Sequence, residues 1–239
     1  IGLLSFLDLG VGNALTNTVS KSLSTKNRND IKDAVTGGLF IIFFVAIFVF
    51  VLLTILLKFL PIDQLFKTQS ELDQIILISL EMFVVCFSIT IFSNGIQRIF
   101  HGMQLGFLVH IMLTIGSIIS LVLLYYFSTL KVEINMLVFA SMIGNILASI
   151  PLLIILISKD LFSFRGVLLS INSQYKNIIN LGGAFFLIQI GTIILIGADS
   201  LIISATIGVS GVAIFAITQR LFLFASQPMQ LVNTHLWPA

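Results

Sequence analysis

The sequence contains few charged residues and little cysteine. Asp, Glu, Lys and Arg together make up 9% of the chain, whereas an ordinary soluble domain carries about 25%. Hydrophobic residues make up 58%, and the mean hydropathy is +1.14. The one cysteine, Cys86, lies in an apolar run, which excludes an intramolecular disulfide and a multi-thiolate metal site. This composition indicates an integral membrane protein.

Several patterns that carry chemistry in other proteins are absent from the sequence. No group of His, Cys, Asp and Glu residues has the spacing of metal ligands. No glycine-rich phosphate loop opens a helix, and no nucleophile elbow is present. No period-2 alternation typical of barrel strands runs through the chain, so the membrane spans are expected to be helices. The sequence therefore predicts an all-α polytopic membrane protein with no metal, no cofactor and no nucleic-acid partner.

Seven apolar runs reach the length of about 20 residues that a membrane-spanning helix needs. They cover residues 2–23, 37–60, 74–100, 105–127, 134–158, 183–207 and 211–233. The loops after the first, third and fifth runs are rich in basic residues: Lys21, Lys26, Arg28, Lys32, Arg98, Lys159, Arg165 and Lys176. The other loops carry only Lys58, Lys67 and Lys131. Because short basic loops stay in the cytoplasm, the first group is predicted to be cytoplasmic.

Four ionisable residues fall at membrane depth: Asp8, Glu81, Asp199 and Arg220. An ionised side chain at the centre of a spanning helix costs about 2.5 to 3.5 kcal/mol, so such residues usually face a protein interior or an aqueous cavity. Asp199 and Arg220 lie in consecutive runs, at similar depths if the chain turns near Gly208. We therefore expect that they can meet, either as a structural ion pair or as part of a functional site.

Uncharged polar residues form stripes on the predicted helices. Asn13 and Asn17 lie on the same half of the first helix as Asp8. For Asp8, a hydrogen-bonded packing role and a functional role are both open. In the fifth run Asn145 lies among Ser, Gly and Ala residues, a pattern that is typical of helix packing.

The remaining polar candidates lie in the third, sixth and seventh runs. Arg98 lies at the cytoplasmic end of the third run, where it either extends to the lipid headgroups or faces a cavity. Gln189 shares a helical stripe with Asp199, and Gln227 shares a face with Arg220. These side chains are candidates for lining a polar path.

The longest predicted loop divides the chain into two parts. Charged and apolar residues alternate over residues 159–182, a pattern typical of an amphipathic helix at the cytoplasmic interface. We expect residues 1–158 to form one helical lobe, residues 159–182 to be a linker and residues 183–239 to begin a second lobe. Because the chain begins at Ile1 and ends just after an apolar run, we also expect a fragment of a longer protein.

Two stretches resemble a known family. The first is GLLSFLDLGVGNALTN, residues 2–17, and the second is residues 198–239, which contain ADSLIIS, RLF and the final LWPA. Both are similar to polysaccharide flippases of the O-antigen transporter type, members of the multidrug, oligosaccharidyl-lipid and polysaccharide exporter superfamily. Phe215 departs from the tyrosine expected there. The resemblance implies a two-lobed bundle of about twelve to fourteen helices, of which this chain supplies helices two to eight.

The resemblance also implies a function. Such proteins move a polyprenyl-diphosphate-linked oligosaccharide, an O-antigen or capsule repeat unit, across the bacterial cytoplasmic (inner) membrane by alternating access, without covalent chemistry. Arg220 and Arg98 are then candidates for binding the diphosphate, because guanidinium groups donate bidentate hydrogen bonds. Candidates for the sugar hydroxyls are Asn13, Asn17, Asn145, Gln189 and Gln227. Candidates for coupling to a proton or sodium ion are Asp199, Asp8 and Glu81.

Three other functions are considered. A cation-coupled multidrug exporter of the same superfamily would have an acidic, aromatic-lined cavity, which Arg220 disfavours. A membrane-embedded polysaccharide polymerase or ligase would place basic or catalytic residues in large periplasmic loops, but the predicted outer loops are short. A purely structural membrane subunit is disfavoured by the four ionisable residues at membrane depth.

Overall fold

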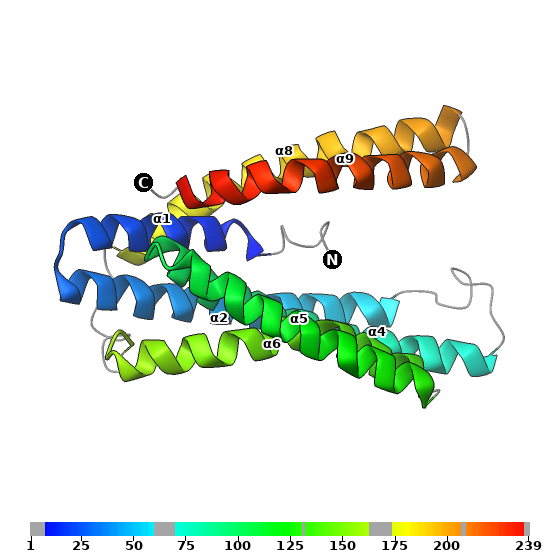
Figure 1. Ribbon diagram of the computed structural model, residues 1–239, viewed down its shortest axis with the longest axis horizontal. Coiled ribbons are helices and arrows are strands. Elements are labelled where there is room, and N and C mark those ends of the chain that lie inside the picture. Colours follow the sequence, from blue (N-terminus) through cyan, green and yellow to red (C-terminus); the bar gives the residue numbers. More distant parts are fainter. Residues whose placement is uncertain (1–7, 60–69, 131, 163–173, 207–208, 237–239) are drawn as a thin grey trace.

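The structure, a computed structural model, describes residues 8–59, 70–130, 132–162, 174–206 and 209–236. This part of the chain is all-helical (Figure 1). Its helices are α1 (Val11–Ser24), α2 (Arg28–Phe59), α4 (Ser70–Gly102), α5 (Gly106–Thr129), α6 (Ile134–Ser158), α8 (Gln174–Thr206) and α9 (Val209–Leu236). Each helix overlaps one predicted apolar run. The prediction of an all-α polytopic membrane protein is confirmed.

Four described segments are long and apolar enough to cross a membrane. They are Arg28–Phe59, Gln74–Gly102, Gly106–Thr129 and Ile134–Ser158, in α2, α4, α5 and α6. Shorter apolar segments, Ile178–Thr192 and Ile214–Ser226, are found in α8 and α9. The exposed side chains of these helices are mostly large and apolar, which suits contact with lipid tails. The protein is therefore a multi-pass membrane protein.

The starts of two helices differ from the predicted boundaries. α2 begins at Arg28, before the apolar run that starts at residue 37. α8 begins at Gln174, so residues 174–182 belong to this helix instead of forming part of a separate interfacial segment. The physical reason is that Ile178 is fully buried in a core cluster with Val11 and Ala14 of α1. The rest of the predicted linker, residues 163–173, lies outside the described residues.

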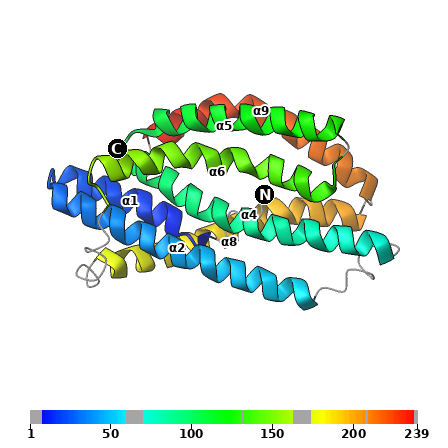
Figure 2. The same ribbon diagram turned by 90° about the horizontal axis from the view of Figure 1, so that it is seen from below.

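The helices form layers around α4. Figure 2 shows α4 between α2 and α6, with α5 on the far side of α6, and these neighbours are in contact. α1 packs on both α2 and α4, α8 packs on α1 and α2, and α9 packs on α8. One core cluster, which includes Leu15, Ile99 and Leu152, joins α1, α2, α4, α5 and α6. The α8–α9 pair thus attaches to the bundle through α1 and α2.

Small residues allow the closest helix contacts. At the α5–α6 crossing, Gly116 and Gly144 touch backbone to backbone, so neither has room for a side chain. The Gly144 amide donates a hydrogen bond to Ser120 Oγ at 2.9 Å, and Ala148 and Ser149 are buried on the same helix. Close approach of small residues is a common way to pack membrane helices. The packing role predicted for this stripe is confirmed for Gly144, Ala148 and Ser149.

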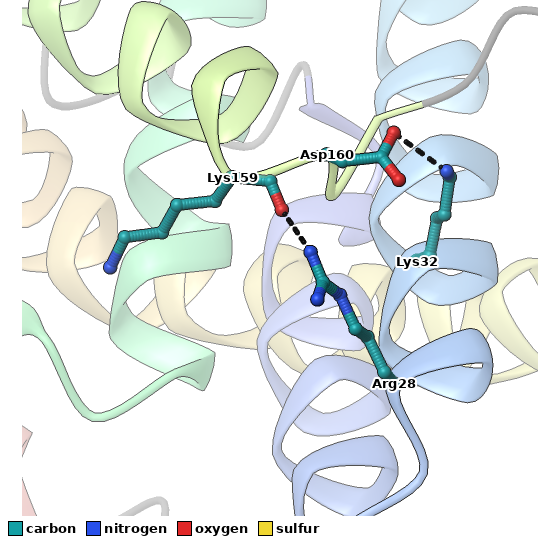
Figure 3. Close-up of polar contacts among 4 residues, drawn as sticks. All are labelled: Arg28, Lys32, Lys159 and Asp160. Carbon is teal, nitrogen blue, oxygen red and sulfur yellow. Dashed lines mark hydrogen bonds and ion pairs between the residues drawn. The ribbon is translucent and has the colours of Figure 1, made fainter.

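The basic corners of the bundle lie at one end. Figure 1 shows the α1–α2 corner, the α4–α5 corner and the end of α6 on the same side. Lys32 Nζ forms an ion pair with Asp160 Oδ1 at 2.8 Å, and Arg28 Nη2 donates a hydrogen bond to the Lys159 carbonyl at 2.8 Å (Figure 3). The hydrogen bond from Lys32 and its charge hold the pKa of Asp160 below its usual range. These contacts tie the start of α2 to the end of α6.

Candidate functional site

A tight turn just before α1 positions the carboxylate of Asp8. Leu9 and Gly10 both adopt left-handed backbone conformations, with φ of 54° and 71°. Inside this turn the Gly10 amide donates a hydrogen bond to Asp8 Oδ1 at 2.9 Å. A side chain at residue 10 would collide with the Gly182 carbonyl and the backbone of Phe186 in α8. Gly10 is therefore required both by the turn and by the close contact between α1 and α8.

Gln189 of α8 also binds Asp8. Its Nε2 donates a hydrogen bond to Asp8 Oδ1 at 3.2 Å, which connects α8 to the start of α1. The other amide atom, Gln189 Oε1, is buried and accepts no hydrogen bond from the described part of the protein. Such an unpaired acceptor is costly to bury unless water or a ligand reaches it. The site therefore has unused hydrogen-bonding capacity.

Arg98 of α4 lies near the same carboxylate. A Cβ atom placed on Gly12 would lie 2.6 Å from Asp8 Oδ2 and 3.4 Å from Arg98 Nε. Gly12 thus leaves the space that the Asp8 carboxylate occupies. The charge of Asp8 acts on Arg98. The backbone carbonyl of Arg98 accepts a hydrogen bond from Thr16 Oγ1 at 3.2 Å, which fixes α4 against α1.

No described residue accepts a hydrogen bond from the guanidinium of Arg98. The residues described in the structure supply it with neither an ion pair nor a side-chain hydrogen bond, although it is only partly exposed. Asp8 is instead held by two neutral donors, the Gly10 amide and the Gln189 side chain. A cation in this state is able to bind an external anion without first breaking a salt bridge.

A second polar site lies between α4 and α6. Gln97 Nε2 donates to Asn145 Oδ1 at 2.7 Å, and Asn145 Nδ2 donates to Asn94 Oδ1 at 2.9 Å. This series of three amides runs from the buried Gln97 to the exposed Asn94. Next to it, Ser149 Oγ donates to Ser93 Oγ at 3.0 Å in the core. Asn145 therefore takes part in a polar interaction between helices, as a packing role requires, but the series also reaches the surface.

The expected meeting of Asp199 and Arg220 is not observed. Both side chains are exposed, on α8 and α9, and no ion pair joins them. Glu81 is exposed on α4, whereas Asn13 and Asn17 are partly buried on α1. The side chain of the last candidate, residue 227, lies outside the described set. Of the predicted site residues, the structure thus brings together Asp8, Arg98 and Gln189, and it joins Asn145 to α4.

Two residues of this region were not predicted as site residues. Asn94 precedes Arg98 by four residues, about one helical turn, and shares its side of α4, and Gln97 directly precedes Arg98. Their closeness to Arg98 in the sequence could have indicated a site. Their hydrogen bonds with Asn145, however, depend on the packing of α4 against α6. No group of three His, Cys, Asp or Glu residues in the described part is placed to hold a metal ion.

Comparison with known proteins identifies the family. Residues 2–238 match the family described as polysaccharide biosynthesis protein. Searches of curated proteins and of solved structures each gave no significant match. Because the match covers nearly the whole chain, this protein belongs to the polysaccharide biosynthesis protein family, in agreement with the resemblance found in the sequence.

Proposed function

We propose that this member of the polysaccharide biosynthesis protein family is a lipid-linked oligosaccharide flippase. Its substrate is a polyprenyl-diphosphate-linked oligosaccharide, such as an O-antigen or capsule repeat unit. It moves this lipid from the cytoplasmic to the periplasmic leaflet of the bacterial inner membrane. Family membership supports a role in polysaccharide synthesis or export, and the multi-pass helical fold supports transport over soluble chemistry.

The guanidinium of Arg98 is the single observation that carries this proposal. It lies within a membrane helix, beside Gly12, with its hydrogen-bond donors unused by the described residues. A diphosphate entering a low-dielectric site needs a fixed cation, and the planar fork of an arginine matches phosphate oxygens. A charge that is only partly exposed and has no ion pair among the described residues is costly to hold, and a phosphate ligand accounts for keeping it there.

Asp8 has a second role in the proposed mechanism. Its carboxylate lies near Arg98 and balances the cation while the site holds no substrate. Protonation of Asp8, or sodium binding to it, would remove a negative charge that repels the diphosphate. Because Gln189 joins Asp8 to α8, the same event would also change a contact between α8 and α1. Asp199 and Glu81 remain further candidates for ion coupling.

The other predicted contacts extend the same proposal. Arg220 remains a candidate for the diphosphate, and the sugar hydroxyls have the candidates Asn13, Asn17, Asn145, Gln189 and Gln227. A cation exporter of the same superfamily is the main alternative. It would require an acidic site, and the guanidinium of Arg98, which has no ion pair among the described residues, disfavours organic cations there.

A complementation experiment tests the function. The gene is expressed in a bacterium whose own surface polysaccharide flippase is deleted, and surface polysaccharide is measured. We expect the wild type to restore it and Arg98→Ala to reduce it at least tenfold at normal membrane abundance, with partial function in Arg98→Lys. The matched control is Arg28→Ala, which removes an arginine at the end of the bundle and should retain most of the function.

Two results would contradict the proposal. Full restoration by Arg98→Ala would mean that this cation is not needed. A wild type that restores no polysaccharide but gives resistance to organic cations would support the exporter instead.

A further inference from the structure

The exposed surface of α4 changes sides at Asn94. The exposed apolar residues Ile78, Val85 and Ile89 form one stripe along this helix. At 100° per residue, Asn94 lies about 140 to 180° around the helix from each of them. It is nevertheless exposed. The apolar stripe suits lipid, although the exposed Glu81 lies about 40 to 80° from it. An exposed amide on the opposite side of α4 suits a polar space better than lipid tails.

α6 shows a less complete change of side. Its exposed Ile150, Ile154 and Ile157 form one apolar stripe, whereas Ile134, near the start of the helix, is exposed within about 20° of Ser141. Ser141 is exposed about 140 to 180° away from all three, and it lies one turn before Asn145. Since Asn145 is hydrogen-bonded to Asn94, the polar exposed sides of the two helices lie next to each other.

The hydrogen bonds leave these groups with capacity for a ligand. Asn94 accepts one hydrogen bond from Asn145, and its own Nδ2 donates none within the described residues. Ser141 Oγ donates to the Val138 carbonyl at 2.7 Å, which leaves its oxygen available as an acceptor. An uncharged surface that offers both amide donors and oxygen acceptors, fixed in place by neighbouring amides, matches the hydroxyl groups of a sugar.

We propose that Asn94, Asn145 and Ser141 form a binding subsite for a neutral, hydroxyl-rich sugar of the transported lipid. This inference rests on the proposed function. Asn94 precedes Arg98 by four residues, about 6 Å along α4. A sugar attached to a diphosphate at Arg98 is therefore within reach of the amide. Asn94 would then bind the sugar and Arg98 the diphosphate of one substrate molecule.

Helix packing accounts for the buried members and for the Oδ1 atom of Asn94, but not for its Nδ2 group. The Ser93–Ser149 and Gln97–Asn145 hydrogen bonds lie inside the α4–α6 contact. Interhelical hydrogen bonds of this kind stabilise membrane bundles. Asn94 lies at the exposed end of the series, where a packing contact would not need a free amide. This difference provides the control for the experiment.

The experiment measures the affinity of the purified full-length protein for two probes. One is undecaprenyl diphosphate, which has no sugar, and the other is the lipid-linked oligosaccharide extracted from the source bacterium. We expect Asn94→Ala to weaken binding of the sugar-bearing probe roughly threefold to tenfold, the loss expected for one or two hydrogen bonds. Its affinity for undecaprenyl diphosphate should not change.

Ser93→Ala is the matched packing control, because it breaks a neighbouring α4–α6 hydrogen bond without altering the exposed surface. It should bind both probes as the wild type does, and thermal unfolding of each variant reports its folding. Equal weakening of both probes by Asn94→Ala, no weakening, or the same loss in Ser93→Ala would overturn the sugar subsite. A wild type that binds neither probe, or an Arg98→Gln variant that binds both normally, would instead refute the proposed function.

Discussion

The chain carries an acid and an arginine in each of two regions, and the structure holds them differently. In the bundle, Asp8 and Arg98 both lie close to Gly12, where α1 and α4 meet. In the α8–α9 pair, Asp199 and Arg220 are both exposed, and no ion pair joins them. Similar depth along consecutive helices therefore did not bring charges together, whereas packing between distant segments did.

The difference follows from what surrounds each charge. Arg98 is confined by α1, and Asp8 is fixed by Gly10 and Gln189. Such confinement holds the charges at a defined spacing, as a binding site requires. Asp199 and Arg220 are exposed and no ion pair joins them, so no contact of this kind fixes their spacing.

Replacing Gly10 should have the largest effect on this arrangement. An alanine there would adopt an unfavourable left-handed conformation and collide with the backbone of α8. We expect Gly10→Ala to destabilise the protein by about 2 kcal/mol or more. The measurement is thermal unfolding of the detergent-purified protein.

Gly183→Ala is the control in the other partner of the same contact, since a Cβ there meets no atom within 4 Å. It should change stability by less than about 0.5 kcal/mol. Equal effects of the two substitutions would show that the close contact between α1 and α8 does not hold the Asp8 turn.

Acidification should reduce the stability of the protein by a smaller amount, through the Lys32–Asp160 ion pair of the bundle. Lys32 holds the pKa of Asp160 below its usual value of about 3.9. A lowered folded-state pKa means that the contribution to stability is present above the unfolded-state value and is lost as the pH falls through the folded-state value. We expect wild type to be slightly more stable than Asp160→Asn near pH 6, with the difference disappearing in strong acid.

Unfolding curves of the two proteins between about pH 6 and pH 2 test this expectation. Asp199→Asn is the comparison in the α8–α9 pair, where no ion pair is present. A stability difference between wild type and Asp160→Asn that grows toward low pH would contradict the assignment.

The sequence predicted the helices better than the site. Each apolar run became a helix because lipid-spanning segments must satisfy their backbone internally. Asp8, Arg98, Gln189 and Asn145 were all identified as candidates from polarity alone. Their grouping was not predictable, because it depends on α1 packing against α4 and α8, contacts between residues far apart in the sequence.

The role of Asn94 was also not predictable from the pattern of polar residues along one helix. Polar residues near a helix end suit the headgroup region equally well. Its significance depends on the exposed side of α4 and on the hydrogen bond from α6. Likewise, the start of α8 at Gln174 is explained by the burial of Ile178 against α1, which the mixed charge pattern of that segment did not indicate.

The most direct test compares the two arginines as binders of undecaprenyl diphosphate. The affinity of the full-length protein is measured for wild type, Arg98→Gln and Arg220→Gln at fixed ionic strength. The account predicts at least a tenfold loss in Arg98→Gln, because a charged bidentate contact is removed, and a smaller change in Arg220→Gln. Normal binding by Arg98→Gln together with a large loss in Arg220→Gln would contradict the placement of the diphosphate beside α1 and α4.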